Sequence, residues 1–345
     1  MGIRTVTGEI SPSDCGITLP HEHLLFDLSS WCPLPTEATR IALAEAPVSI
    51  EILGELRRDA SLSRDNVRQL DVELAIRELM HYRRAGGSTL VDVTSIGLGR
   101  DPMALRAISQ ATGVNVVMGC GYYFESPQLQ YLRNQTIEQI QATIERDLVE
   151  GISNTGIRSG IIGEIGTSGP LTETEERVLR AAARAQLRTH AAISVHPDAF
   201  YQGREHTIRH ILDILIEEGV PLNKVIICHI DDTGFNLDFQ RSLMEQDAFV
   251  EYDSFGSEIY FDSMNAHEAH DSQRVDAVLK LAEEGFASHL LLSHDVCFKI
   301  HLKKYGGYGY DHILRHILPM MRRKGIREKD IDLMMVKNPA TVLAT

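Results

Sequence analysis

Histidine and carboxylate side chains recur in this sequence where short apolar runs end. His21 and His23 lie one residue apart in the run GITLPHEHL (16–24), so an extended backbone would point both imidazoles to the same side. Four more candidates end later apolar runs: Glu164, His196, His229 and Asp295. Neutral imidazoles combined with carboxylates are typical ligands of zinc and other first-row divalent ions. The pattern predicts a metal site, provided that the fold brings these run ends together.

The number of candidate ligands favours two metal ions over one. A tetrahedral catalytic zinc uses three protein ligands and keeps one position open, whereas this set offers six. We expect the two histidines of the first run and Asp295 to hold one ion. His196 and His229 would hold the second ion, and the Glu164 carboxylate would bridge both. Paired ions about 3.5–4 Å apart lower the pKa of bound water and polarise an attacked carbonyl or phosphoryl group.

Each candidate taken alone has an ordinary structural explanation. An isolated His-x-His pair is more often not a metal site, and a lone glutamate among glycines could be a buried acid that accepts backbone N–H groups. The tripeptide Ser293–Asp295 could cap a helix. The coincidence of all six candidates at run ends is what favours the metal site. His294 precedes Asp295 and should point to the opposite side of its strand, away from the candidate ligands, because successive strand residues alternate in direction.

Eight apolar runs alternate with amphipathic segments along the whole chain. The runs span residues 16–24, 88–95, 114–121, 159–166, 191–198, 225–231, 248–255 and 289–296. Runs that are nearly continuous in apolar residues are typical of parallel strands covered on both faces. The segment 71–86 has apolar residues at helical spacing, and Thr172 followed by Glu175 forms a capping box. This alternation predicts either a closed (β/α)8 barrel or a long doubly wound sheet.

The first run decides between these two folds. No GxGxxG motif follows it, and the candidate ligands lie at the carboxyl ends of the runs, where barrel active sites form. We expect one TIM-barrel domain over residues 1–345, with a short N-terminal β-hairpin. The longest irregular segment, 27–69, contains the only tryptophan, Trp31. We expect this segment to be a loop with helix over 48–58 that covers the mouth of the barrel.

Composition and charge limit the possible partners. The chain has 345 residues and a formal net charge of −14, which argues against nucleic acid or an anionic membrane as the main partner. Its five cysteines form no CxxC pair, so neither a disulfide framework nor a zinc ribbon is indicated. No apolar run approaches about 18 residues, and no signal-peptide pattern is present. We expect a cytoplasmic protein that acts on a small molecule.

Several of these motifs together resemble the phosphotriesterase family of the amidohydrolase superfamily, and most of all its phosphotriesterase-related branch. They are TLPHEHL, IIGEIGTSGPLTETEERVL, SVHPDA, VIICHIDDT, EYDSFG, LLLSHDV and KKYGGYGYDHIL. The resemblance covers about residues 3 to 343. It implies a TIM barrel, often a homodimer, with a binuclear centre that usually holds zinc, Mn²⁺, Co²⁺ or Ni²⁺ being alternatives. The resemblance also implies the same six metal ligands, namely His21, His23, Glu164, His196, His229 and Asp295.

Two departures from the family pattern bear on the substrate. Many members bridge the metals with a carboxylated lysine, but here that position is Glu164, as in the related branch, and no lysine precedes Lys224. A proton-relay histidine of the true triesterases has no counterpart, since EYDSFG offers Asp253 and Ser254. Tyr123 matches a tyrosine that lies near the leaving group in lactonases of the family. Efficient phosphotriester turnover is therefore not expected.

The first functional hypothesis is a metal-dependent hydrolase. A hydroxide that bridges the metals would attack the carbonyl of a lactone, an ester or an N-acyl amide. Asp295 would be both ligand and general base, Glu164 would complete the catalytic centre, and Trp31 and Tyr123 would contact the substrate. Asp232 would either receive the proton or support its strand. Phosphotriesterase activity is the alternative within hydrolysis, and a non-catalytic small-molecule-binding protein is the alternative outside it.

Overall fold

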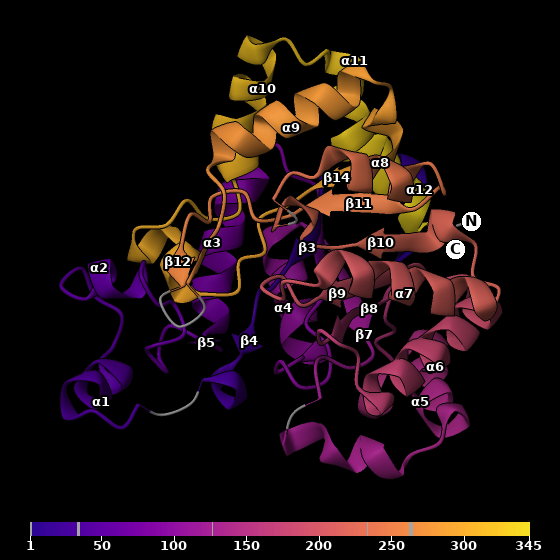
Figure 1. The fold of residues 1–345 in the computed structure, drawn as a ribbon, viewed down its shortest axis with the longest axis horizontal. Coiled ribbons are helices and arrows are strands. Elements are labelled where there is room, and N and C mark those ends of the chain that lie inside the picture. The colour runs from indigo at the N-terminus through magenta and orange to yellow at the C-terminus, as the bar shows by residue number, and fades with distance from the viewer. Residues whose placement is uncertain (1, 33–34, 126, 233, 262–264) are drawn as a thin grey trace.

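The computed structural model describes residues 2–32, 35–125, 127–232, 234–261 and 265–345. Eight parallel strands form its centre (Figure 1). They are β3 (Thr18–Glu22), β6 (Thr89–Asp92), β7 (Asn115–Cys120), β8 (Ile161–Thr167), β9 (Ile193–Pro197), β10 (Val225–Ile227), β11 (Phe249–Tyr252) and β14 (Leu290–Leu292). Each of the eight predicted runs contains or overlaps one of these strands, so the strand prediction is confirmed.

The strand order identifies the sheet as a barrel. Neighbours follow one another as β14-β11-β10-β9-β8-β7-β6-β3, so chain order and spatial order agree. Among the described residues β3 and β14 share no strand ladder, but side-chain and backbone bonds join them. The Ser293 hydroxyl lies 2.7 Å from the His21 carbonyl oxygen, and the His21 N–H donates to Ser293 Oγ at 3.1 Å. This seam completes the (β/α)8 barrel and excludes the doubly wound sheet.

Helices surround the barrel and cover its outer face (Figure 1). The main ones are α3 (Val72–Arg84), α4 (Pro102–Thr112), α5 (Ile137–Val149), α6 (Glu173–Thr189), α7 (Arg204–Glu217), α8 (Leu237–Met244), α9 (Asp271–Glu283), α10 (Leu318–Lys324), α11 (Glu328–Asp332) and α12 (Asn338–Leu343). The predicted capping box begins α6, where the Glu175 N–H donates to the Thr172 hydroxyl at 3.2 Å. No helix of the described residues is long and apolar enough to span a membrane.

The expected N-terminal hairpin closes the end of the barrel opposite the strands' carboxyl ends. It consists of β1 (Ile3–Thr5) paired antiparallel with β2 (Gly8–Ile10). The Val6 N–H donates to the carbonyl oxygen of Val116, near the start of β7. The two chain ends meet there, since Gly2 and Thr345 exchange backbone hydrogen bonds of 3.1 and 3.0 Å. The hairpin therefore leaves the end at the carboxyl ends of the strands open for a functional site.

The long segment after β3 forms a separate lobe (Figure 1, indigo to violet). It holds η2 (Ser29–Trp31), α1 (Ala38–Glu45) and α2 (Leu53–Leu56), and β4 (Phe26–Asp27) pairs with β5 (Arg68–Gln69) where it returns. The predicted helix over 48–58 is wrong in extent, since only α2 is helical there and α1 lies upstream. The physical reason is a turn: the Ile52 N–H donates to the Ser49 carbonyl oxygen at 3.3 Å, so the helix begins only at Leu53.

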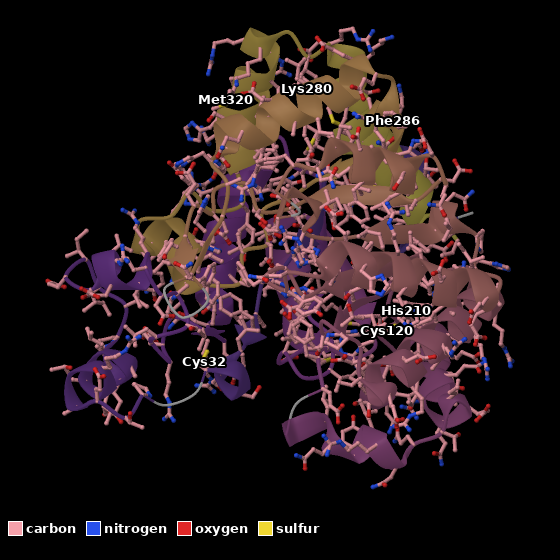
Figure 2. All side chains as sticks on the ribbon, viewed as in Figure 1. Cys32, Cys120, His210, Lys280, Phe286 and Met320 are labelled. Carbon is pink, nitrogen blue, oxygen red and sulfur yellow. The ribbon has the colours of Figure 1, made fainter. Side chains whose placement is uncertain are left out.

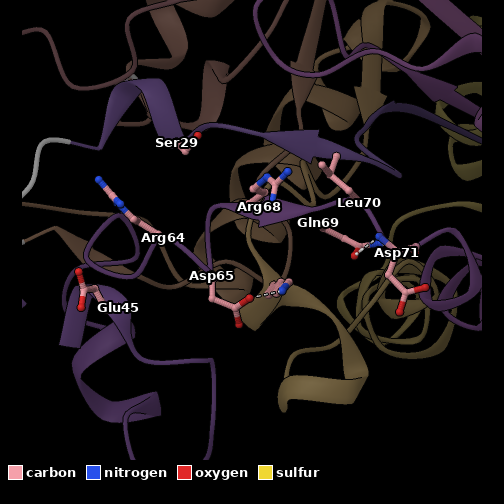
Figure 3. A pocket seen from close by; sticks show the side chains of 9 residues that line it. Ser29, Glu45, Arg64, Asp65, Arg68, Gln69, Leu70 and Asp71 are labelled. Carbon is pink, nitrogen blue, oxygen red and sulfur yellow. Dashed lines mark hydrogen bonds and ion pairs between the residues drawn. The ribbon is translucent and has the colours of Figure 1, made fainter. Parts of the chain in front are cut away.

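A surface hollow of about 620 Å³ marks the base of this lobe (Figure 3). Three of its charged residues form ion pairs: Asp65 bonds Lys299 at 2.5 Å, and Arg68 bonds Asp27 at 2.9 Å. Lys299 belongs to the chain after β14, so these contacts hold the lobe against the opposite side of the barrel seam. The lobe is thereby fixed over the carboxyl ends of the strands.

None of the five cysteines is paired in a disulfide. All five are free thiols; Cys15, Cys120 and Cys228 are buried, and Cys32 and Cys297 are partly exposed. Figure 2 places Cys32 in the lobe and Cys120 among the strands and helices. Cys228 packs with its thiol 3.1 Å from Ser194 Oγ and 3.4 Å from the Glu251 carboxylate.

Candidate metal centre

The six candidate ligands come from five strands and meet at the carboxyl end of the barrel. His21 lies in β3, Glu164 in β8 and His196 in β9, whereas His229 and Asp295 follow β10 and β14. The last two adopt left-handed backbone, with φ of 53° and 51°. Non-glycine residues seldom adopt this conformation, which costs on the order of 1–3 kcal/mol and is concentrated at functional sites.

The Glu164 carboxylate lies at the middle of the cluster. Its Oε1 is 3.3 Å from His23 Nε2. Its Oε2 is 3.4 Å from His21 Nε2 and 2.7 Å from His196 Nδ1. Gly163 precedes it with a φ of 134°, and a Cβ there would lie 2.5 Å from the Ser194 carbonyl oxygen. The glycine in the IIGEIG motif therefore lets β9 approach closely beside the carboxylate.

Two donor sets drawn from the candidate ligands are compact enough to hold a cation. In the set of His21, His23 and Asp295, one atom from each residue lies within 4.8 Å of the others, and the same is true of His21, Glu164 and His229. A third set that meets this criterion, made of His21, Cys228, Glu251 and Asp253, lies behind the candidate ligands. His21 Nε2 and Asp295 Oδ1 are buried and have no hydrogen-bond partner. Buried polar atoms without a partner are rare and need an explanation, and a divalent cation between these atoms would provide one. The residues thus fit a metal centre.

The second predicted histidine pair is also brought together. His229 Nε2 lies 2.6 Å from His196 Nδ1, and His196 Nδ1 in turn faces Glu164. The compact donor set that contains His229 also contains His21 and Glu164. His21 therefore belongs to both donor sets, which sequence spacing did not predict. Since His21 is fully buried, the pair His21–His23 reaches the deepest part of the centre.

Residues behind the ligands fix the direction of each imidazole ring. His23 Nδ1 is 2.9 Å from Thr94 Oγ1, His229 Nδ1 is 2.8 Å from Asp253 Oδ1, and His21 Nδ1 is 3.3 Å from Glu251 Oε2. Because Nδ1 makes these contacts, Nε2 of His21 and of His23 points toward Glu164 and Asp295. Nε2 of His229 points toward His196. Such contacts select the tautomer and raise the basicity of a metal ligand.

Sequence reasoning missed Thr94 and Glu251 as partners of the ligands. Their only signal was polarity within otherwise apolar runs, at 88–95 and 248–255. Asp253 was noted in place of a relay histidine, but it is buried and accepts both the His229 backbone N–H and the ring. Ser254, its neighbour, does line the cavity.

Nearby carboxylates raise the pKa of His23 and His229, whereas burial and the neighbouring His229 lower the pKa of His196. Burial would lower the pKa of His23, but Asp295 and Glu164 raise it to about 10. Burial would likewise lower the pKa of His229, and Asp253 raises it to about 10. Burial raises the pKa of Glu164, yet the surrounding imidazoles hold it well below its usual value. The carboxylates of Glu164 and Asp295 beside these rings also favour a divalent cation, whose binding releases protons from protonated imidazoles.

A cavity of about 430 Å³ opens onto this cluster. Its wall includes His23, Glu164, His196, His229 and Asp295. Apolar and aromatic side chains make up much of the remainder: Phe26, Leu28, Leu98, Phe124, Phe200, Phe261 and Phe298. Such a lining, with a few polar groups at one end, is typical of small-molecule sites.

The two residues predicted to contact substrate have different outcomes. Tyr123 lines the cavity, and its hydroxyl lies 3.2 Å from His196 Nε2. The side chain of Trp31 lies outside the described residues. Leu28 and Cys32, on either side of it, line the cavity, so the lobe covers the mouth of the barrel.

Some of the other polar residues near the barrel mouth line this cavity, and others do not. Asp232 and Cys297 line it, and burial together with Asp231 and Glu268 raises the pKa of Asp232 well above its usual value. His267 and His270 are exposed and do not line it. Contacts of these two histidines with a substrate in this cavity are therefore not supported.

Comparisons with known proteins agree with this arrangement. The model of the phosphotriesterase family matches residues 1–343. An N-acetyltaurine hydrolase from Danio rerio is 36% identical over 347 residues, which cover 98% of this chain and 96% of that protein. A resiniferatoxin-binding protein from Rhodobacter sphaeroides has a TM-score of 0.95 and 40% identity, covering 99% of this chain and 94% of that one. The phosphotriesterase homology protein from Escherichia coli has a TM-score of 0.78 and 27% identity, covering 96% and 99%. This chain belongs to the phosphotriesterase family and is a hydrolase.

Proposed function

We propose that the chain is a binuclear metal-dependent hydrolase of carbonyl substrates. One divalent ion would be held by the His21–His23 pair and Asp295, the other by His196 and His229, and Glu164 would be shared. The observation that carries this proposal is the position of Glu164, whose carboxylate lies within 3.4 Å of imidazole nitrogens of three other residues. When bound, such ions lower the pKa of water and polarise a carbonyl oxygen.

Asp295 is suited to take the proton from the attacking water. Its side chain is 19% exposed, against 2% for Glu164, so it faces the cavity. Burial would raise its pKa, but the His23 ring 3.2 Å away and the other nearby imidazoles lower it, so the carboxylate is ionised near neutral pH. Tyr123 would bind the leaving group, since its hydroxyl lies at the cavity wall beside His196.

The substrate that we propose is an N-acyl amide with an uncharged, apolar group. Relatives named N-acetyltaurine hydrolase favour the amide bond. Among the described residues that line the cavity none is Lys or Arg, so an anionic group away from the metal centre would find no Lys or Arg to pair with there. Arg204 lines a neighbouring hollow with Asp232 and does not line this cavity. Lactone hydrolysis is the second candidate, favoured by the position of Tyr123.

Metal removal should abolish turnover reversibly. We expect a chelator to reduce hydrolysis of an N-acyl amide panel to background, and added Zn²⁺, Mn²⁺ or Co²⁺ to restore it, with two equivalents of ion bound per chain. Elemental analysis and rate measurements on the same samples test this expectation. Fewer than one equivalent in reconstituted protein, or rates that are insensitive to the chelator, would contradict the metal centre. A protein that binds ions but hydrolyses no ester, lactone, amide or phosphotriester would instead be a binding protein.

The aromatic cavity should prefer a neutral aromatic amine over a sulfonate. We expect kcat/KM for N-acetylphenethylamine to exceed that for N-acetyltaurine by on the order of 10–100-fold, because burying a phenyl group contributes about 1.5–3 kcal/mol. Phe200, whose ring lies 4.7 Å from that of Phe261, lines the cavity. Phe200→Ala should reduce this preference. Equal or greater efficiency on N-acetyltaurine would refute the proposed selectivity.

We also propose that residues 1–345 form one domain and that the protein is a cytoplasmic homodimer, as the family resemblance implies. Light scattering on the purified chain tests the dimer. A mass near the chain's own 38.5 kDa would contradict it.

A further inference from the structure

Two residues that alternate with the candidate ligands point away from the cluster and meet behind it. Glu22 lies between His21 and His23, and His294 precedes Asp295. Glu22 is fully buried and His294 is 3% exposed. His294 Nδ1 lies 2.6 Å from Glu22 Oε1. The middle residues of the HEH and SHD motifs are thus hydrogen-bonded to each other.

The Glu22 carboxylate accepts hydrogen bonds from most of the segment around Asp295. Its Oε1 accepts from the Ser293 hydroxyl at 2.8 Å and from the His294 backbone N–H at 3.0 Å. Its Oε2 accepts the Val296 N–H at 3.1 Å. His294 Nε2 accepts the Ile313 N–H at 3.0 Å, which leaves the ring proton on Nδ1, directed at Glu22. Bonds to a carboxylate are roughly twice as strong as neutral ones.

These bonds lie at the barrel seam, where they have most influence. Among the described residues no ladder joins β3 to β14. The donor set of His21, His23 and Asp295 nevertheless spans this seam, with two members on one side and one on the other. Asp295 also has the unusual φ of 51°, and its N–H reaches the His21 carbonyl oxygen at 3.3 Å. Its position relative to the histidines therefore depends on this single backbone bond and on side-chain bonds, and not on a strand ladder.

We propose that Glu22 is a positioning residue of the metal centre. Its carboxylate holds residues 293–296 against β3 and so sets the distance from Asp295 to His21 and His23. This role rests on the proposed metal centre. Residues behind metal ligands typically contribute about 10–100-fold to metal affinity or activity.

The test compares Glu22→Gln with a matched control, Glu78→Gln. Glutamine at position 22 keeps the size of the side chain but presents an amide N–H₂ to one set of N–H donors. Glu78 is also buried, and its carboxylate accepts the N–H groups of Lys303 and Lys304, both at 3.0 Å. It too fastens a segment that follows β14, but it contacts no candidate ligand. A general loss of stability should therefore affect both variants alike.

The readouts are metal affinity by chelator competition, the visible spectrum of the Co²⁺ form, and kcat and KM separately. We expect Glu22→Gln to bind one of the two ions at least tenfold more weakly, to change the Co²⁺ spectrum and to lower kcat more than it raises KM. Glu78→Gln should lower the melting temperature and leave metal affinity, the Co²⁺ spectrum, kcat and KM unchanged. Equal metal binding by Glu22→Gln and wild type, or equal weakening in both variants, would overturn the proposed role.

A second pair of variants tests the same contact if Glu22→Gln does not fold. His294→Ala removes the ring N–H that Glu22 accepts, whereas His294→Asn keeps a donor near that place. We expect the alanine variant to lose metal affinity and the asparagine variant to recover most of it. Indistinguishable affinities would overturn the role. Wild-type protein that binds no metal would overturn the proposed function itself, and with it this role.

Discussion

Asp295→Asn should lower kcat by about 10²–10⁴-fold, the range that general acid–base catalysis contributes, and by more if the side chain also holds a metal. Asparagine has the same shape, and the backbone bond from residue 295 to His21 does not involve the side chain. The amide cannot accept a proton as the carboxylate does, and it is a weaker ligand. Single-turnover and steady-state rates on the same amide, with bound metal quantified, measure both effects.

The matched control for this variant is Asp147→Asn. Asp147 is buried and bonds Arg100 at 2.9 Å, on α5 and outside the cavity. We expect this control to lose stability and keep its kcat. Asp295→Asn that turns over substrate at the wild-type rate with full metal occupancy would exclude Asp295 as the base. Loss of activity together with loss of metal would show that its role is ligation.

The sequence indicated where the candidate ligands lie because parallel strands leave little freedom at their carboxyl ends. His21 and His23 share a face of β3 by alternation, which needs no tertiary information. His229 and Asp295 follow their strands in left-handed backbone, which alternation does not describe. Their position within a run was enough to place them at the barrel mouth, but not to orient them.

The residues behind the ligands could not be paired from sequence, because each contact joins distant strands. Glu251 lies 230 residues from His21, and Thr94 lies 71 residues from His23. In a closed barrel such partners are neighbours only after all eight strands have formed. Of the helix expected over 48–58, only α2 (Leu53–Leu56) forms, since the residues from Ser49 to Ile52 make a turn.

Glu164→Gln should cause the largest loss of metal, because this residue contacts ligands of both proposed positions. The carboxylate faces His21 and His196 through one oxygen and His23 through the other. An amide removes the negative charge and places N–H₂ beside an imidazole nitrogen. The loss of metal affinity and of kcat/KM should exceed the roughly 10–100-fold that is typical of residues behind metal ligands. Elemental analysis after dialysis and kcat/KM measure the two effects.

Glu175→Gln is the matched control, since Glu175 is buried in the capping box of α6 and accepts N–H and O–H groups from Ser168 and Thr172. Its loss should cost about 1 kcal/mol of stability, as for other helix caps, and should spare the metal content. If Glu164→Gln kept two equivalents of metal, the carboxylate would not be the shared ligand, and the two ions would have to be held by the histidines and Asp295 alone. If it kept one equivalent, the position of the remaining ion would show which donor set binds metal without Glu164. Retention by His21, His23 and Asp295 is expected, because that set forms a compact group without Glu164.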